Sequence, residues 1–214
     1  MTTQELTKPR ATSGALFATG AIICTAYQAL ALILLHWLRT DLAPVSNFIS
    51  NYAVGPFGWI MTTWFVAGAC NIVLLSMGLA RSGLKSATAR IAMFLMVIEA
   101  LGLLVSAAFP VDPPGAPSTR TGDIHDYSFL ANVINFVLIP VLLPFSYGTH
   151  PGWRTFRPTA WALAGLIGIA FAIQFATLHK GMPYGIANRF FVAVIFAWNL
   201  ATAARLRTVL LSRC

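Results

Sequence analysis

Six long apolar runs, almost free of charged residues, constrain this sequence more than any other feature. Each is roughly 20 residues or slightly longer, the length that an α-helix needs to cross the hydrocarbon core of a bilayer. In lipid only helices and closed barrels satisfy every backbone group, and none of the runs alternates as barrel strands do. We therefore predict an all-α, six-transmembrane-helix bundle. The runs cover residues 14–38, 57–80, 89–109, 127–147, 159–179 and 186–204.

The scarcity of charge excludes several classes of protein. Only 9% of the 214 residues are charged, whereas soluble domains contain about a quarter. A water-soluble enzyme, a disordered tail and a nucleic-acid-binding protein are therefore excluded. The six spans leave only short connections, so we expect a single membrane domain over residues 1–214.

The positions of the basic residues predict the orientation. Of the 14 Lys and Arg residues, alternate connecting segments contain ten on one side and four on the other. By the positive-inside rule, this asymmetry places both termini in the cytoplasm. We expect the protein to lie in the cell inner (plasma) membrane. The net charge of +8 then indicates contact with membrane lipids rather than with nucleic acid.

Two connections on the predicted outer face are unusual. Residues 109–117 are rich in proline and form a stiff, turn-rich segment before Asp126, which we expect to cap the following helix. Residues 44–58 are too apolar for a solvated loop, so we expect them to lie at the interface or to re-enter the bundle.

Four short motifs lie at the predicted outer ends of the helices. They are Pro44-x-Ser46-x-x-x-Ser50-x-Tyr52 with Gly58-Trp59, Phe109-Pro110-x-Asp112, Gly122-x-x-His125, and Gly185-x-x-x-Arg189 with Trp198. In this order the chain resembles the domain-of-unknown-function 998 family of six-helix prokaryotic membrane proteins. The resemblance implies the fold and the orientation, and the family name assigns no activity.

The motifs indicate a site in one layer near the outer headgroups. We predict that Asp112, His125 and Arg189, with Ser46 and Ser50, bind a lipid headgroup or a small anionic or amphipathic ligand. A purely structural alternative is a clasp in which Asp112 pairs with Arg189 and His125 caps a helix.

Catalysis is a further alternative, as a membrane-embedded lipid hydrolase or transferase. The sequence contains no HxxxH or HExxH pair, no nucleophile elbow and no cofactor-binding fingerprint. We therefore expect no metal and no cofactor, and the sequence does not decide whether the protein is an enzyme.

Glu99 lies near the middle of the third apolar run, where an ionisable group is costly and is a functional hypothesis by default. One interpretation is a protonated carboxyl that bonds Gln28 or Asn135 from neighbouring helices. The other is a small proton-coupled transporter that uses Glu99.

The remaining polar residues in the spans are expected to form hydrogen bonds between helices. These residues are Asn71, Asn132, Gln174 and Asn199. A stripe of small residues in the run 159–179 predicts close helix packing and a possible homo-oligomer contact, and it comprises Ala164, Gly168, Ala172 and Ala176.

Overall fold

The structure is a computed structural model that describes residues 8–179 and 181–212, with side chains from residue 14 onward. It is all-α within those residues, and six of its helices are long and apolar enough to span a membrane. These are α1 (Lys8–Leu38), α2 (Gly58–Arg81), α3 (Ala87–Ala108), α4 (Arg120–Tyr147), α6 (Arg157–Ala176) and α7 (Tyr184–Leu211). The short elements are the 3-10 helix η1 (Ile49–Ala53) and α5 (Pro151–Arg154).

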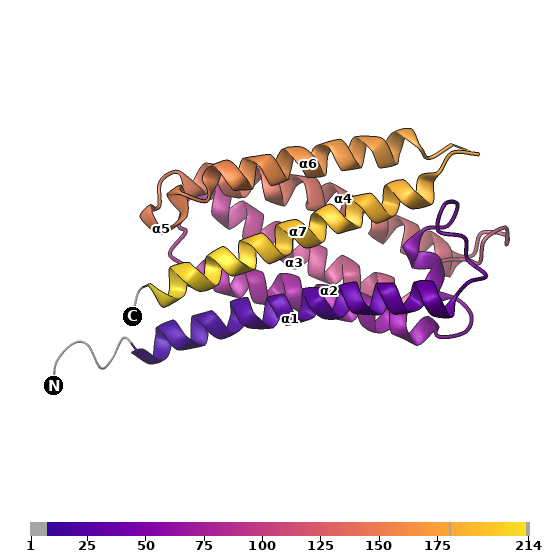
Figure 1. The fold of residues 1–214 in the computed structure, drawn as a ribbon, viewed down its shortest axis with the longest axis horizontal. Helices are drawn as coiled ribbons and strands as arrows, with labels where there is room; N and C mark the ends of the chain where they lie inside the picture. Colours follow the sequence, from indigo (N-terminus) through magenta and orange to yellow (C-terminus); the bar gives the residue numbers. More distant parts are fainter. Residues whose placement is uncertain (1–7, 180, 213–214) are drawn as a thin grey trace.

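The six long helices run alongside one another (Figure 1), and their contacts close into a ring. The main contacts follow the order α1, α2, α3, α4, α6, α7 and back to α1, and α2 also contacts α7 across the ring. Apolar side chains from all six meet inside the ring, including Leu35, Met61, Met96, Leu143, Ile167 and Phe191. The predicted six-helix fold is therefore confirmed.

The two ends of the bundle differ in character (Figure 1). We call the end that holds the start of α1, the end of α7 and α5 the terminal end, and the opposite end, with residues 39–57, 109–119, 177–179 and 181–183, the loop end. That the terminal end faces the cytoplasm remains a prediction from the basic residues.

Helix α4 begins at Arg120 rather than at residue 127, because its cap is Thr119. The Thr119 hydroxyl accepts a hydrogen bond from the Gly122 amide at 3.2 Å. The prediction that Asp126 caps this helix was therefore wrong, since Asp126 lies inside it. The apolar pattern located only the lipid-spanning part of α4, because residues 120–126 are mostly polar.

Candidate functional site

The first loop-end connection is docked onto α7 by Arg189. Its Nη1 donates to the carbonyl oxygens of Pro44 and Asn47, at 2.9 and 2.7 Å, and its Nη2 donates to the Tyr52 hydroxyl at 3.1 Å. Its Nε donates to Nε2 of His36 at 2.7 Å. We call residues 44–52 the cover segment, since Arg189 holds them across the loop end.

Two further residues of α7 complete this docking surface. The Gly185 amide donates to the Val45 carbonyl at 3.0 Å, and a Cβ at Gly185 would lie only 2.6 Å from the Asn47 carbonyl oxygen. Oδ1 of Asn188 accepts from the Ile49 amide at 3.1 Å. The spacing of Gly185, Asn188 and Arg189 puts all three on one helix face, which explains the last sequence motif.

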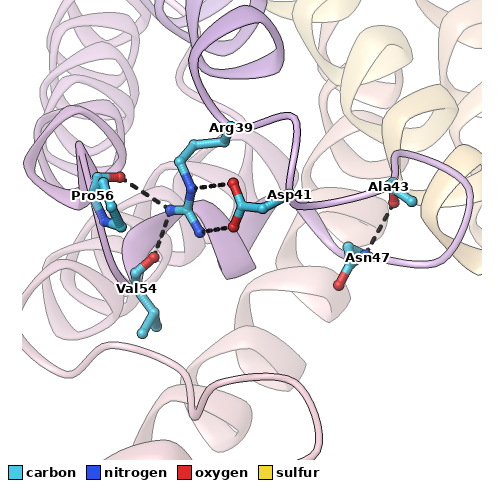
Figure 2. A network of polar contacts seen from close by, with 6 residues as sticks. All are labelled: Arg39, Asp41, Ala43, Asn47, Val54 and Pro56. Atoms are coloured by element: carbon cyan, nitrogen blue, oxygen red, sulfur yellow. Dashed lines mark hydrogen bonds and ion pairs between the residues drawn. The ribbon is translucent and has the colours of Figure 1, made fainter.

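Arg39 clamps the other half of the same connection (Figure 2). Its Nε and Nη2 pair with both carboxylate oxygens of Asp41, at 2.9 and 2.8 Å, while Nη1 donates to the carbonyls of Val54 and Pro56. The Arg39 hydrogen bonds hold the pKa of Asp41 below its usual value. Within the cover segment, Nδ2 of Asn47 donates to the carbonyl of Ala43, the residue that precedes the segment, at 3.1 Å.

The second and third motifs form a separate contact between the end of α3 and the start of α4. Asp112 accepts hydrogen bonds from the hydroxyl and the amide of Thr119, at 2.7 and 2.8 Å, which lower its pKa. A Cβ at Gly122 would collide with the Asp112 carboxylate. Nδ1 of His125 donates to the Phe109 carbonyl at 2.8 Å.

Asp112, His125 and Arg189 thus each have different partners. No ion pair joins Asp112 to Arg189 in the described part of the chain, where the ion pair found is Arg39–Asp41. The structural alternative of a clasp between Asp112 and Arg189 was therefore wrong, and His125 does not cap α4, since it lies within the helix. Every guanidinium nitrogen of Arg189 already donates to a protein acceptor, so the residue is committed to holding the cover segment.

A cavity of about 290 Å³ lies inside the loop-end half of the ring. Its walls come from α1, α2, α3, α4, α7 and the cover segment, and α6 contributes no residue among those described. Of the predicted site residues, His125 and Ser50 line it, whereas Ser46 is exposed and Asp112 and Arg189 lie outside the lining. The polar lining residues are Gln28, Ser50, Asn71, Ser106, His125, Asp126, Asn132, Asn188 and Asn199.

Three asparagines in the cavity wall lack partners for buried polar atoms. Neither Nδ2 nor Oδ1 of Asn71 is hydrogen-bonded, although the residue is only 1% exposed. Oδ1 of Asn132 and Oδ1 of Asn199 also have no partner. The expectation of interhelical hydrogen bonds is wrong for these atoms. A buried polar atom without a partner costs about 1–3 kcal/mol, so these amides are not explained by stability.

The fourth polar residue of that group, Gln174, behaves as expected at its Oε1 but not at its Nε2, which is buried without a partner. Oε1 of Gln174 on α6 accepts a hydrogen bond from Nδ2 of Asn188 on α7, at 3.4 Å. Gln174 therefore joins two helices, and it lies outside the cavity lining.

His125 presents an acceptor at the cavity wall. A carbonyl oxygen only accepts, so the bond to Phe109 places the proton on Nδ1 and leaves the lone pair on Nε2. Nε2 has no hydrogen-bond partner among the described residues. The ring is 2% exposed and packs edge-on against Phe65, with centroids 5.7 Å apart.

The cavity has little charge. No Lys or Arg lines it within the described residues, and Asp126, on the second turn of α4 at the loop end, is its carboxylate. Its other walls are largely aromatic and aliphatic, and include Phe65, Phe129, Phe136, Phe191, Ile195 and Phe196. This lining matches a ligand that is mostly apolar and carries a few neutral hydrogen-bonding groups.

Glu99 is buried in α3, with 1% exposure, and its Oε1 has no hydrogen-bond partner. It lies one turn farther from the loop end than Leu103, which lines the cavity. The predicted bonds to Gln28 or Asn135 are absent, since Nε2 of Gln28 donates instead to the Trp64 carbonyl at 3.2 Å. Within residues 8–179 and 181–212, no three His, Cys, Asp or Glu side chains are placed to hold a metal ion.

Sequence reasoning located the motifs but missed the cavity beneath them. The available signal was the recurrence of amides in otherwise apolar spans, at Gln28, Asn71, Asn132, Asn188 and Asn199. Asn71, Asn132 and Asn199 were assigned to helix packing, Gln28 to a bond with Glu99, and Asn188 to no role, because a sequence does not distinguish an amide that faces a neighbouring helix from one that faces a cavity.

Comparison with known proteins gives a family and no individual relative. A family model described as "Protein of unknown function (DUF998)" matches residues 22–205, a range that contains all four motifs. No curated protein and no solved structure matches the chain.

Proposed function

We propose a ligand-binding function for this chain, which belongs to the DUF998 family of multi-pass membrane proteins, a family with no assigned activity. The ligand is a neutral, amphipathic molecule of the kind found in or at a bilayer. It binds in the cavity between α1, α2, α3, α4 and α7, with its polar group at the asparagines and its apolar part along the aromatic walls.

The observation that carries this proposal is the set of unpartnered amides in the cavity. Asn71, Asn132 and Asn199 are buried, come from three different helices and together have four side-chain polar atoms without a hydrogen-bond partner, of which Oδ1 of Asn132 packs against Gly102 of α3. An amide both donates and accepts, so hydroxyl, carbonyl or amide groups of a ligand satisfy it. Nε2 of His125 adds an acceptor for a ligand hydroxyl.

The charge and size of the cavity support a neutral ligand. A buried anion needs a cationic partner or several donors, and the described lining offers no Lys or Arg. A volume of about 290 Å³ is at the small end of ligand pockets. It holds one polar group with a short apolar segment, such as the hydroxyl-bearing end of a lipid.

Native mass spectrometry of the purified protein tests the proposal. We expect a co-purified non-protein mass to be retained by the unmodified chain and lost from Asn132→Leu. Asn135→Leu is the matched control, since Asn135 is a buried amide on the same helix but lies outside the lining.

Two results would contradict the proposal. One is that the unmodified chain retains no small molecule when it is extracted from native membranes. The other is that Asn132→Leu and Asn135→Leu retain the same mass to the same extent, because the cavity amides would then have no part in binding.

A second candidate, proton-coupled transport, is favoured by the buried and unpartnered Oε1 of Glu99. A carboxyl at that depth is a common carrier of protons in transporters. Glu99→Gln distinguishes the two functions in proteoliposomes. Transport predicts that a proton flux seen with the unmodified chain disappears, whereas simple binding predicts that no flux is seen with either chain.

A further inference from the structure

We propose that His36 and Arg189 form a proton-sensitive latch that holds the cover segment over the cavity. Protonation of His36 releases Arg189, and the cover segment then moves away from the cavity mouth. The purpose of this latch rests on the proposed ligand-binding function, but its movement is measurable without any ligand.

The cover segment is itself part of the cavity wall, because Phe48, Ile49 and Ser50 line it. The Phe48 ring packs against Tyr184 at the start of α7 and against Phe129 of α4, with centroids 4.9 and 6.3 Å apart. It therefore fills the space between two helices that are not neighbours in the ring.

Phe48 also lines a second, smaller hollow of about 160 Å³ at the loop end. The other residues of that hollow are Leu178, His179 and Tyr184. Because Phe48 is common to both linings, it forms the partition between them. Displacement of the cover segment would join the outer hollow to the inner cavity and give a ligand a path from the loop end.

Arg189 is the main attachment of the cover segment, through the Pro44 and Asn47 carbonyls and the Tyr52 hydroxyl. The position of its guanidinium is set on the opposite side by His36 on α1, whose Nε2 accepts from Nε at 2.7 Å. The latch thus connects α1, α7 and the cover segment at one point.

The hydrogen bonds fix the charge state of His36. The Leu32 carbonyl, 2.6 Å from Nδ1, only accepts, so Nδ1 carries a proton. Nε of Arg189 only donates, so Nε2 of His36 carries the lone pair. The latch therefore requires the neutral imidazole, and a second proton would remove the acceptor and place a cation against the guanidinium.

Among the residues that the structure describes, no carboxylate faces His36 to offset that charge. The groups that face His36 are Arg189 from α7 and Tyr52 from η1, whose ring is edge-on with centroids 5.2 Å apart. Asp41, in the connection that follows α1, is already paired with Arg39. Residues 58–69 of α2, the neighbouring helix, contain no ionisable side chain. Histidine is the side chain that changes charge between about pH 5 and pH 8.

Cysteine labelling tests the latch on the full chain in detergent. Ser50→Cys is introduced after the native cysteines are replaced by alanine, and its rate of reaction with a bulky maleimide is measured with His36 and with His36→Gln. Glutamine keeps a neutral acceptor at every pH. Comparing the two rates at the same pH cancels the effect of pH on the thiol and on the other histidines.

We expect the two rates to agree at about pH 7.5, and the chain with His36 to react about tenfold faster at about pH 5.5. Tenfold corresponds to about 1.4 kcal/mol. His179→Gln is the control, because His179 lies in the outer hollow but outside the latch, and it should keep the pH response. Equal rates at both pH values would overturn the proposal.

A second variant guards against a His36→Gln chain that does not fold. His36→Lys places a permanent cation beside Arg189 and should label rapidly at about pH 7.5, and slow labelling there would contradict the latch. Both labelling results are independent of native mass spectrometry. A working latch without a bound mass would refute ligand binding alone, and a bound mass without a pH response would refute the latch alone.

Discussion

Asn71 has the least favourable surroundings of any polar residue in the cavity wall. Both of its side-chain polar atoms are buried without a partner, in a region where an aliphatic side chain would fit the neighbouring Ile72 and Leu103. A fold selected for stability alone would not keep an amide there. Substitution of Asn71 should therefore affect ligand binding and folding stability in opposite directions.

We predict that Asn71→Leu raises the free energy of unfolding by about 1–3 kcal/mol, the cost of a buried polar group without a partner, while it weakens ligand retention. Thermal unfolding in detergent and native mass spectrometry measure the two effects. Asn188→Leu is the control and should destabilise the protein, because Asn188 bonds the Ile49 amide and Gln174. A lower stability for Asn71→Leu would show that the amide has a structural role.

Asp112 gives a prediction about pH. Its hydrogen bonds from Thr119 lower its pKa in the folded protein, so their contribution is present above the ordinary pKa of an aspartate. It is lost as the pH falls through the lowered pKa. In Thr119→Val the pKa of Asp112 should rise towards its ordinary value, as measured by NMR of the carboxyl carbon. Asp41, held by Arg39, should keep its lowered pKa, and an unchanged Asp112 would contradict the assignment.

The helices and their connections differ in how far the sequence predicted them. The six spans were predictable, since a run of apolar residues long enough to cross a bilayer has one stable form there. The partners of Arg189 were not, because they are mainly backbone carbonyls, and no residue type marks a carbonyl that turns towards an arginine. The start of α4 was missed for a related reason, since its first turns are polar and extend beyond the apolar run.

The docking of the cover segment on α7 depends on a glycine. We predict that Gly185→Ala displaces the segment, because the new Cβ would lie 2.6 Å from the Asn47 carbonyl oxygen and backbone cannot yield as a side chain can. Hydrogen exchange at the Ile49 amide should rise about tenfold, equivalent to about 1.4 kcal/mol.

Gly165→Ala on α6 is the matched control for this substitution. Nothing lies within 4 Å of a Cβ at that position, and alanine favours a helix over glycine by about 1 kcal/mol. Exchange at Ile49 should therefore remain unchanged in Gly165→Ala. Equal exchange in both variants would show that Gly185 is not needed for docking.

The ring as a whole places both termini at one end, as an even number of spans requires (Figure 1). We predict that this end faces the cytoplasm. Reporter fusions check the orientation: a fluorescent protein at either terminus should fluoresce, and a phosphatase inserted at residues 113–116 should be active outside. Active phosphatase at the C-terminus would reverse the orientation, and with it the side from which protons reach His36.

Helix α6 closes the ring without lining the described cavity, and it supports the wall from behind, because Gln174 accepts a hydrogen bond from the lining residue Asn188. It packs on α4 and α7 and adds nothing to the described cavity wall, while Ala172 and Ala176 of its small-residue stripe are exposed. We therefore predict that substitutions on its outward side alter contacts with neighbouring proteins in the bilayer and leave the proposed ligand binding unchanged. In this fold, the surface that contacts other membrane proteins and the proposed ligand site lie on different helices, so each is able to change in evolution without the other.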